Sequence, residues 1–395
     1  MPFDATVPLN GAPDPWAPSS TPARRAGPPY LMTEMIAAEP ALAARLARRL
    51  TGGEGAAATR SLADEIRAAS EARSPVVTTG CGTSEHAAIA AAWLLGDALG
   101  ADDGLSVHQR QALDVAVSPP GKGLVIAVSH EGGTWATNEA LRAAGAAGAS
   151  TALVTVSARS PGASLADHVI ETGEQDHSWC HTVGFLAPLV VAGALAGQLR
   201  GIPLDPPGIR GLLEAASQQS AGESPADEIA KRLATSARVL VVGGGIDFVA
   251  AREMALKAEE GSGLPATALH LETIRHGHLA SADERTSLVV VLTGGEETDE
   301  PYRVRARGLL RAAQALGMPA AAILGARVGP QVPESLTPAG RMQSPEANRL
   351  PPMVESILAS AIPLQLIAER LARARGRNPD LIGRDDPRQA AAADA

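Results

Sequence analysis

The chain has 395 residues, of which 45 % are hydrophobic, 19 % charged and only 2 % aromatic. This apolar content is enough for sizeable cores, so it excludes a chain disordered throughout, and the length predicts two or three domains. The net charge of −9 argues against a nucleic-acid partner, because binding many phosphates needs a positive field. Two cysteines cannot form a disulfide framework, so we expect a reducing, cytoplasmic location.

Both ends of the chain lack periodic apolar sequence. Residues 1–29 contain eight prolines, which predicts a disordered or surface-bound arm. They show no basic region followed by an apolar one, so they do not read as a signal peptide. Residues 386–395 predict a disordered tail. We therefore expect the folded part to span about 30–385.

Short apolar runs alternate with helical stretches in the first half of the folded part. We expect strands at 75–79, 124–129, 152–156 and 169–171, and helices at 84–99, 134–144 and 179–199. This alternation is typical of a parallel α/β sheet. The longest apolar run, 183–197, has 15 residues. A bilayer span needs roughly 20 residues, so the run predicts a buried helix.

The same alternation restarts after a helical connector at 205–237. We expect strands at 238–242, 288–292 and 320–324, and helices at 247–260, 302–315 and 352–374. Glycines and small residues join the first strand to the first helix in both halves, in TTGCGTSEHAAIAA and VVGGGIDFVAAREMA. This likeness indicates an internal duplication. The expected domains are 30–204, with a lead-in helix, and 238–385.

Gly80–His86 is the first candidate ligand loop. Its glycines stand between a strand and a helix, where the backbone approaches a ligand and the helix N-terminus offers N–H groups to an anion. The hydroxyls of Thr83 and Ser84 add donors. An equally weighted alternative is that one of these two side chains only caps the helix.

The second candidate loop is Ser129–Thr134, with the sequence SHEGGT, again between a strand and a helix. It lacks the Gly-Lys-Ser/Thr ending of a nucleotide-binding P-loop. Two hydroxyl-bearing loops in one half predict a pocket for a polyol or a phosphosugar at the carboxyl ends of the strands.

These motifs resemble those of the sugar isomerase (SIS) domain family. GCGTSEHA is similar to the family's first substrate loop and SHEGGT to its phosphate loop. Three later segments, ALKAEE, RHG and IPLQL, resemble further motifs in the family's order. Over about 30–385 the chain therefore resembles double-SIS proteins, in particular the isomerase half of glucosamine-6-phosphate synthases. The resemblance implies an α/β fold with two tandem, flavodoxin-like, doubly wound parallel sheets.

The resemblance also implies roles for individual residues. Glu260 falls where the family places the base that moves a proton between C1 and C2 of the sugar. His276 falls where an acid/base opens the sugar ring, supplied across a homodimer interface. The substrate-binding positions fall on Gly82, Thr83, Ser84, Ser129, His130, Glu131 and Thr134. Such a site acts on a small sugar phosphate with a carboxylate base and a proton donor; neither a metal nor a cofactor is expected, and neither is a membrane partner.

Simpler interpretations stand beside these roles. Glu253, Lys257 and Glu260 share one helical face, which is typical of an ordinary solvated ion pair. His276 and His278 are a weak candidate metal pair. The segment 176–181 is expected to line the sugar pocket, with ordinary packing and metal binding as alternatives.

Three departures from the family pattern affect the expected chemistry. Residue 2 is Pro2 and not the cysteine of a glutaminase, so glutamine-dependent amination is not expected. Glu131 replaces a serine and repels a phosphate unless it turns away or is offset by a cation such as protonated His130. We favour a phosphate held by backbone N–H groups, Ser129 and Thr134. The family's tail lysine is also missing, and Arg377 and Arg384 are the nearby cations.

The leading hypothesis is a phosphosugar aldose/ketose isomerase or an aminosugar-phosphate deaminase that transfers a proton between C1 and C2. One alternative is a non-catalytic sugar-phosphate sensor, which the altered phosphate loop and the missing lysine favour. Another is a deglycase that cleaves sugar-amine phosphates. The presence of both Glu260 and His276 favours an enzyme over a sensor.

Overall fold

The computed structural model describes residues 3–100, 107–220, 224–294, 300–347 and 349–393. Within these ranges the chain forms two compact units. Unit 1 contains residues 1–20, 38–176 and 183–210, and unit 2 contains 21–37, 177–182 and 211–395. The short segments 21–37 and 177–182 therefore belong to unit 2. We expected residues 30–37 and 177–182 in the first domain.

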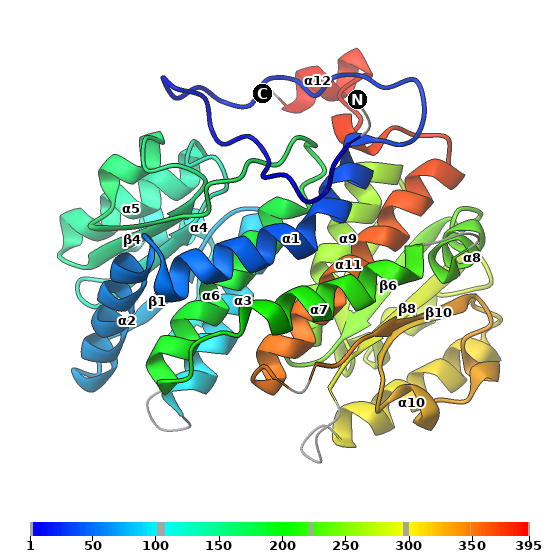
Figure 1. The fold of residues 1–395 in the computed structure, drawn as a ribbon. Coiled ribbons are helices and arrows are strands. Elements are labelled where there is room, and N and C mark those ends of the chain that lie inside the picture. The colour runs from blue at the N-terminus through cyan, green and yellow to red at the C-terminus, as the bar shows by residue number, and fades with distance from the viewer. Residues whose placement is uncertain (1–2, 101–106, 221–223, 295–299, 348, 394–395) are drawn as a thin grey trace. The chain divides into compact units, whose positions relative to one another are not determined.

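Unit 1 is built on a five-stranded parallel sheet with the strand order β2-β1-β3-β4-β5 (Figure 1). Its strands are β1 (Val76–Thr79), β2 (Val107–Gln109), β3 (Leu124–Val128), β4 (Ser150–Thr155) and β5 (His168–Glu171). Its helices are α2 (Ala56–Glu71), α3 (Thr83–Leu99), α4 (Ala112–Val117), α5 (Trp135–Ala147) and α6 (Val183–Arg200). Two further helices, α1 (Leu31–Gly52) and α7 (Pro206–Ser217), contain residues of both units.

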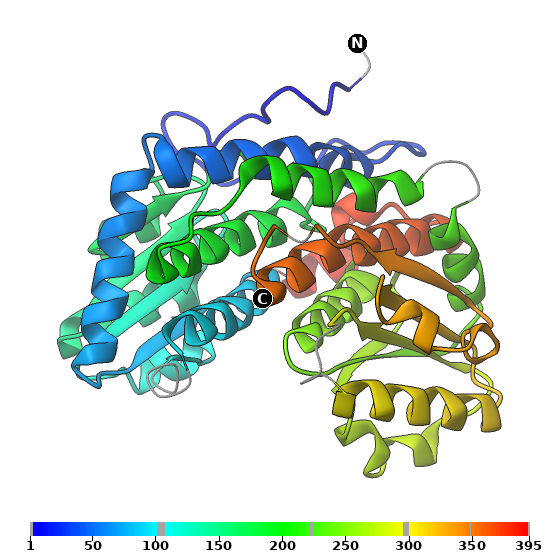
Figure 2. The same ribbon diagram turned by 60° about the horizontal axis from the view of Figure 1, so that its bottom comes forward.

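Unit 2 repeats this architecture. Its strands are β6 (Arg238–Gly243), β7 (Ala266–His270), β8 (Thr286–Leu292), β9 (Ala320–Gly325) and β10 (Gly340–Ser344), all parallel, in the order β10-β9-β8-β6-β7. The helices are α8 (Pro225–Leu233), α9 (Asp247–Ser262), α10 (Glu300–Ala315), α11 (Pro352–Ala374) and α12 (Pro387–Ala393). Figure 2 shows α10, in gold, and α11, in orange, on opposite faces of this sheet. Numbered within each unit, both sheets have the order 2-1-3-4-5 of flavodoxin-like folds, so the expected fold is confirmed.

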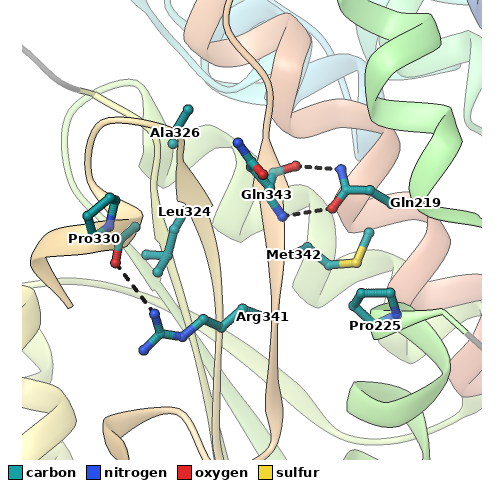
Figure 3. A pocket seen from close by; sticks show the side chains of 10 residues that line it. Gln219, Pro225, Leu324, Ala326, Pro330, Arg341, Met342 and Gln343 are labelled. Carbon is teal, nitrogen blue, oxygen red and sulfur yellow. Dashed lines mark hydrogen bonds between the residues drawn. The ribbon is translucent and has the colours of Figure 1, made fainter. Parts of the chain in front are cut away.

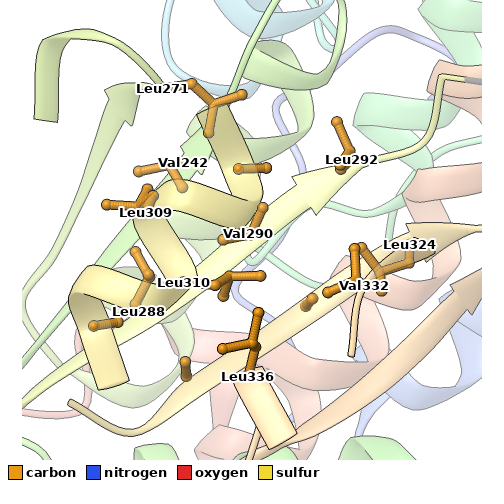
Figure 4. Close-up of a cluster of buried hydrophobic side chains, with 14 of the residues drawn as sticks. Val242, Leu271, Leu288, Val290, Leu292, Leu309, Leu310, Leu324, Val332 and Leu336 are labelled. Carbon is orange, nitrogen blue, oxygen red and sulfur yellow. The ribbon is translucent and has the colours of Figure 1, made fainter. Parts of the chain in front are cut away.

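Helices on both faces explain why the central strands are apolar throughout. β8 is buried at all seven positions. Val242, Leu288 and Val290 pack on one face against Leu309 and Leu310 of α10, in the cluster of Figure 4. A strand buried on both faces has no reason to alternate with polar residues.

The apolar helix α6 belongs to the core of unit 1. By length and composition it is long enough to cross a membrane, but 83 % of the relevant window is buried inside the protein. The helix begins at Val183 and not at Trp179 as expected from the sequence. The carboxylate of Asp176 accepts a hydrogen bond from the N–H of Gly184 (3.1 Å) and so satisfies a donor at the helix start.

The structure describes the proline-rich segment at the start of the chain from residue 3 onward. Its first part, residues 3–20, is here called the N-terminal arm and lies on unit 1. The backbone N–H of Leu9 donates to Glu174 (2.8 Å), and the N–H of Gln175 donates to the carbonyl of Asn10 (2.9 Å). Of the two expected alternatives, the surface-bound arm is the one that these contacts describe. At the other end, the expected disordered tail contains the exposed helix α12, and its last two residues lie outside the described part.

In each unit the first strand and the helix that follows it, β1 and α3 or β6 and α9, approach so closely that only glycine fits between them. A Cβ atom on Gly80 would lie 2.6 Å from the carbonyl oxygen of Ser84, and one on Gly243 would lie 2.4 Å from that of Asp247. Two residues further on, Gly82 and Gly245 have φ angles of +58° and +56°. The same two constraints at matching positions support the internal duplication.

We expect Gly80→Ala to lower the free energy of unfolding by about 1–3 kcal/mol, because the helix start must move to admit the methyl group. Gly211→Ala is the control, since a Cβ there meets no atom within 4 Å and alanine favours a helix by up to about 1 kcal/mol. Denaturant unfolding of both variants measures the difference. Equal stability of the two would contradict the proposed crowding at Gly80.

Candidate functional site

The turn between β1 and α3 carries the first predicted loop. Gly82 occupies the N-cap position, and Thr83 and Ser84 are the first two residues of the helix. The N-cap residue makes no side-chain capping bond. Gly82 therefore stands at the cap position that we considered for Thr83 or Ser84. Gly82 is exposed, Ser84 half-buried and Thr83 buried.

The loop between β3 and α5 brings two of the predicted hydroxyls together. The hydroxyl of Ser129 donates to the hydroxyl oxygen of Thr134 at 3.3 Å. Ser129 is buried, whereas Thr134 is exposed at the N-cap of α5 and makes no capping bond. Accepting from Ser129 leaves the O–H of Thr134 able to donate to a ligand. We call these two residues the hydroxyl pair.

His130 and Glu131, between the hydroxyl pair, turn toward the loop after β5. The Nε2 atom of His130 accepts a hydrogen bond from the N–H of Asp176 (3.0 Å). This hydrogen bond occupies Nε2 of His130, so this nitrogen faces the loop after β5 and not a ligand at the hydroxyl pair. The Oε1 atom of Glu131 accepts from the N–H of Ser19 (3.2 Å) and from Nε2 of Gln175 (3.3 Å).

The corresponding end of unit 2 is closed by a carboxylate of the chain itself. Asp247, the first residue of α9, is 6 % exposed. Its carboxylate accepts from the N–H of Thr293 (2.9 Å) and from the hydroxyl of the same residue, directly after β8. A phosphate at this helix N-terminus would meet the buried carboxyl group of Asp247.

Helix α9 holds the predicted base next to a buried ammonium group. The side chain of Lys257 is 0 % exposed; its Nζ atom lies 2.7 Å from Oε2 of Glu260 and 3.3 Å from Oε1 of Glu253. Burial by itself would lower the pKa of Lys257, but the two carboxylates together outweigh it and raise the pKa above its ordinary value. Glu253 is fully buried and the side chain of Glu260 is 23 % exposed.

This arrangement corrects the interpretation of these residues as a solvated ion pair. Glu253 and Lys257 were not among the residues that we proposed for the site. The only signal was their spacing on the same helical face as Glu260, which does not tell whether that face is buried. The structure places the ammonium of Lys257 in hydrogen-bond contact with the carboxylate of Glu260 and thereby fixes the orientation of that carboxylate.

His276 lies on the surface of unit 2. Its side chain is 70 % exposed and its Nε2 atom is 3.0 Å from Oε1 of Glu272. This hydrogen bond, aided by Arg305 and Arg275, lowers the pKa of the Glu272 carboxyl. The imidazole of His276 thus pairs with Glu272 and not with Glu260, so within one chain the structure does not bring the two predicted catalytic side chains into contact.

The segment 177–182 and the C-terminal tail pack on each other within unit 2. The N–H of Trp179 donates to the carbonyl of Asp380 (3.0 Å), and the guanidinium of Arg384 lies over the Trp179 ring, 4.9 Å from its centre. Of the two cations considered in place of the missing lysine, Arg384 is thus engaged with an aromatic face. Cys180 is buried, and its Coulomb interaction with Lys257 helps to raise the pKa of that lysine.

The other cation, Arg377, borders a polar cavity of about 460 Å³ in unit 2. Arg25, Tyr30 and Gly261 also line it, and Gly261 directly follows the candidate base Glu260. Arg25 is already paired with Glu34 through two hydrogen bonds of 2.9 and 2.8 Å.

A second cavity, of about 430 Å³, lies beside the edge strand β10 and contains none of the predicted site residues. Figure 3 shows the side-chain amide of Gln219 bonded to both backbone groups of Gln343. On the same strand, Nη1 of Arg341 donates to the carbonyl of Gly329 (3.4 Å).

Neither a metal site nor a reactive thiol emerges from the described residues. Within those ranges, no group of three or more His, Cys, Asp or Glu side chains is arranged to hold a metal ion. This search included His278 and the segment 176–181, which we considered as candidate metal ligands. Burial raises the pKa of Cys81, in the first loop, so its thiol is a poor nucleophile at neutral pH.

The fold and the two loops resemble those of tandem SIS proteins, and comparison with known proteins confirms this resemblance. No family model matches the chain. The chain is 25 % identical to the glutamine–fructose-6-phosphate aminotransferase of Gloeobacter violaceus, over 76 % of its own length and 49 % of the relative. It thus spans about half the length of the curated relatives that it matches.

Solved structures show the same fold. The C-terminal domain of glucosamine-fructose-6-phosphate aminotransferase from Francisella tularensis superimposes with a TM-score of 0.75 at 18 % identity, covering 91 % of this chain and 99 % of that one. The tagatose-6-phosphate ketose/aldose isomerase of Escherichia coli gives a TM-score of 0.71 at 18 % identity, covering 92 % and 97 %.

We expect Lys257→Met to lower the free energy of unfolding by about 3–5 kcal/mol, because the buried carboxylate of Glu253 loses its ammonium partner. Adding Glu253→Gln to this variant removes the unpaired charge and is expected to recover most of the loss. Denaturant unfolding of the single and double variants measures both values. A single variant as stable as the wild type would contradict the buried ion pair.

Proposed function

We propose that the chain is a sugar-phosphate isomerase or an aminosugar-phosphate deaminase that transfers a proton between C1 and C2. The observation that carries the proposal is the carboxylate of Glu260, which lies 2.7 Å from the ammonium of a fully buried lysine and is itself partly exposed. A base must be ionised, fixed in orientation and reachable by the substrate. Glu260 meets the three conditions.

The substrate class is inferred from the loops of unit 1 and from the relatives. The exposed hydroxyl of Thr134 stands at the N-terminus of α5, where N–H groups and the helix dipole favour an anion. The matched relatives are named for reactions of fructose 6-phosphate and for ketose/aldose isomerisation of tagatose 6-phosphate. A hexose 6-phosphate, with or without an amino group, fits both lines of support.

In the proposed reaction, Glu260 removes a proton from the carbon next to the carbonyl of the open-chain sugar. The electron pair moves to the carbonyl oxygen, which takes up a proton to give an enediol or enolamine. Returning the proton to the former carbonyl carbon, while the hydroxyl on the adjacent carbon releases its proton and becomes the new carbonyl, completes an isomerisation. Deamination and deglycation begin with the same proton transfer and differ only in the bond that breaks afterwards.

A non-catalytic sugar-phosphate sensor is the second candidate. It is favoured by Glu131, an acidic residue in the phosphate loop, and by the missing tail lysine, for which Arg377 and Arg384 are the nearby cations; Arg384 packs on Trp179. Arginine stays protonated and forms no Schiff base. A sensor needs no buried ion pair beside an accessible carboxylate, which is why we place the enzyme first.

For the cellular setting we propose the cytoplasm, with no nucleic acid and no membrane as partner. The support is the net charge of −9 and the two free cysteines, Cys81 and Cys180. The partner that we propose is a second copy of the chain.

Proton exchange tests the proposed chemistry whichever product the protein forms. We expect the wild-type protein in D2O to introduce deuterium at C1 or C2 of a hexose 6-phosphate, as followed by NMR, with ammonia and ketose measured in parallel. Glu260→Gln is expected to reduce the exchange by about 10²–10⁴-fold while sugar phosphate still binds.

Glu259→Gln is the matched control, because Glu259 is the exposed neighbour on the same helix and accepts a hydrogen bond from the backbone N–H of Ala266 (3.1 Å). Exchange at wild-type rate in Glu260→Gln would exclude Glu260 as the base. Tight binding with no exchange on any sugar phosphate would establish the sensor instead.

The exposed position of His276 leads us to propose that it acts in the site of a second copy of the chain. We expect Glu260→Gln and His276→Asn to be inactive alone and to regain about a quarter of the wild-type activity when mixed under conditions that exchange subunits. Random pairing makes half of the dimers mixed, and each of these has one intact site. A mixture that stays inactive, or a monomer in solution, would rule out the shared site.

A further inference from the structure

The N-terminal arm crosses the edge of unit 1 at which parallel α/β sheets bind ligands. It contacts the loops that follow three adjacent strands. The ring of Trp16 approaches Gly133 after β3, Arg159 after β4 donates to the carbonyl of Ala12 (3.3 Å), and Gln175 after β5 donates to Asn10 (2.9 Å). The arm therefore lies next to the loop of the hydroxyl pair.

One of the arm's contacts is with the acidic residue of this loop. The Oε1 atom of Glu131 accepts from the backbone N–H of Ser19 at 3.2 Å and from the Gln175 side chain at 3.3 Å. Both donors are neutral, and the described residues give Glu131 no ion pair within 4 Å. The carboxylate is thus fixed in direction while its charge is not cancelled.

The strand order, together with these hydrogen bonds, shows on which side of β3 the Glu131 carboxylate is held. In the order β2-β1-β3-β4-β5, the loop after β1 with Thr83 and Ser84 lies on one side of β3, and the loop after β5 with Gln175 lies on the other. Glu131 is bonded on the β5 side. The hydroxyl pair has its own hydrogen bond, at 3.3 Å, and Glu131 takes no part in it.

We propose that the N-terminal arm is a specificity element, in which the N–H of Ser19 holds the Glu131 carboxylate away from the hydroxyl pair so that the loop can accept a phosphate dianion. The proposal rests on the sugar-phosphate substrate class given above. It makes Ser19 a positioning residue and Glu131 the group that it controls.

The reason is the range of Coulomb repulsion. Two negative groups at 4 Å repel about twice as strongly as at 8 Å, and more strongly in a partly buried loop than in water. Neutral N–H donors cannot remove the charge of Glu131, so they act only by fixing where it lies. A carboxylate released from Ser19 can turn toward the bound phosphate and weaken its binding.

Ser19→Pro tests this in the full chain, because proline has no N–H to donate. Ser20→Pro is the matched control, since it places the same ring one residue further along the arm, at an N–H that does not contact Glu131. The probes are glucose 6-phosphate, inorganic phosphate and glucose, with dissociation constants measured by calorimetry. We expect Ser19→Pro to weaken both phosphate-bearing probes by about tenfold or more relative to Ser20→Pro, with a much smaller change for glucose.

Glu131→Gln in the Ser19→Pro background separates this role from a merely structural one. Removing the charge is expected to restore the affinity for glucose 6-phosphate, although the arm contact is still missing. Unchanged phosphate affinity in Ser19→Pro would overturn the proposal. So would a loss that Glu131→Gln does not reverse, an equal loss for glucose, or a wild-type protein that binds glucose more tightly than its phosphate.

These outcomes are distinguishable from a failure of the proposed enzyme. The binding experiment does not depend on turnover, so a sensor that lacks proton exchange still shows the effect of Ser19→Pro. Conversely, an active enzyme whose phosphate affinity is unchanged in Ser19→Pro would support the proposed function and overturn this inference.

Discussion

In each unit, the close approach between the first strand and the helix that follows it determines how that helix presents its N-terminus. At Gly80 and Gly243 the backbone of the helix start comes within van der Waals contact of the strand end, and no side chain fits between them. This contact turns the chain sharply out of the sheet and directs the first N–H groups of the helix over its carboxyl edge. The first candidate loop and the start of α9 both depend on this local constraint.

The two units use the same constraint for different purposes. In unit 1 the helix starts are accompanied by hydroxyls, and the only acid of the second loop is bonded on the far side. In unit 2 the equivalent helix start is closed by Asp247 and Thr293. Unit 2 instead buries Lys257 on the face of α9 that carries Glu260. In the function that we propose, unit 1 supplies the phosphate-binding edge and unit 2 supplies the base.

The central strands could be predicted from the sequence, whereas three of the four edge strands could not; the exception is β5, which was expected at 169–171. β3 and β8 are buried at every position, so each is a continuous apolar run. β2, β7 and β10 were all missed; they are edge strands with mixed burial and polar residues such as His108, Thr267 and Gln343.

The candidate site divides in the same way. Its loops follow from short motifs, whose glycines and hydroxyls are adjacent in sequence. The partners that decide their chemistry are distant: Ser19 is 112 residues from Glu131. The burial of Lys257 is likewise a property of packing, because spacing along a helix shows which side chains share a face and not what covers it.

The side-chain amide of Gln219 protects the edge strand β10 against association with other chains. It donates to the carbonyl of Gln343 at 2.6 Å and accepts from the N–H of the same residue at 2.8 Å. These are the two bonds that a neighbouring strand would make. A single side chain thus imitates an additional strand and occupies the open border of the sheet, which is where unrelated chains otherwise join and start to aggregate.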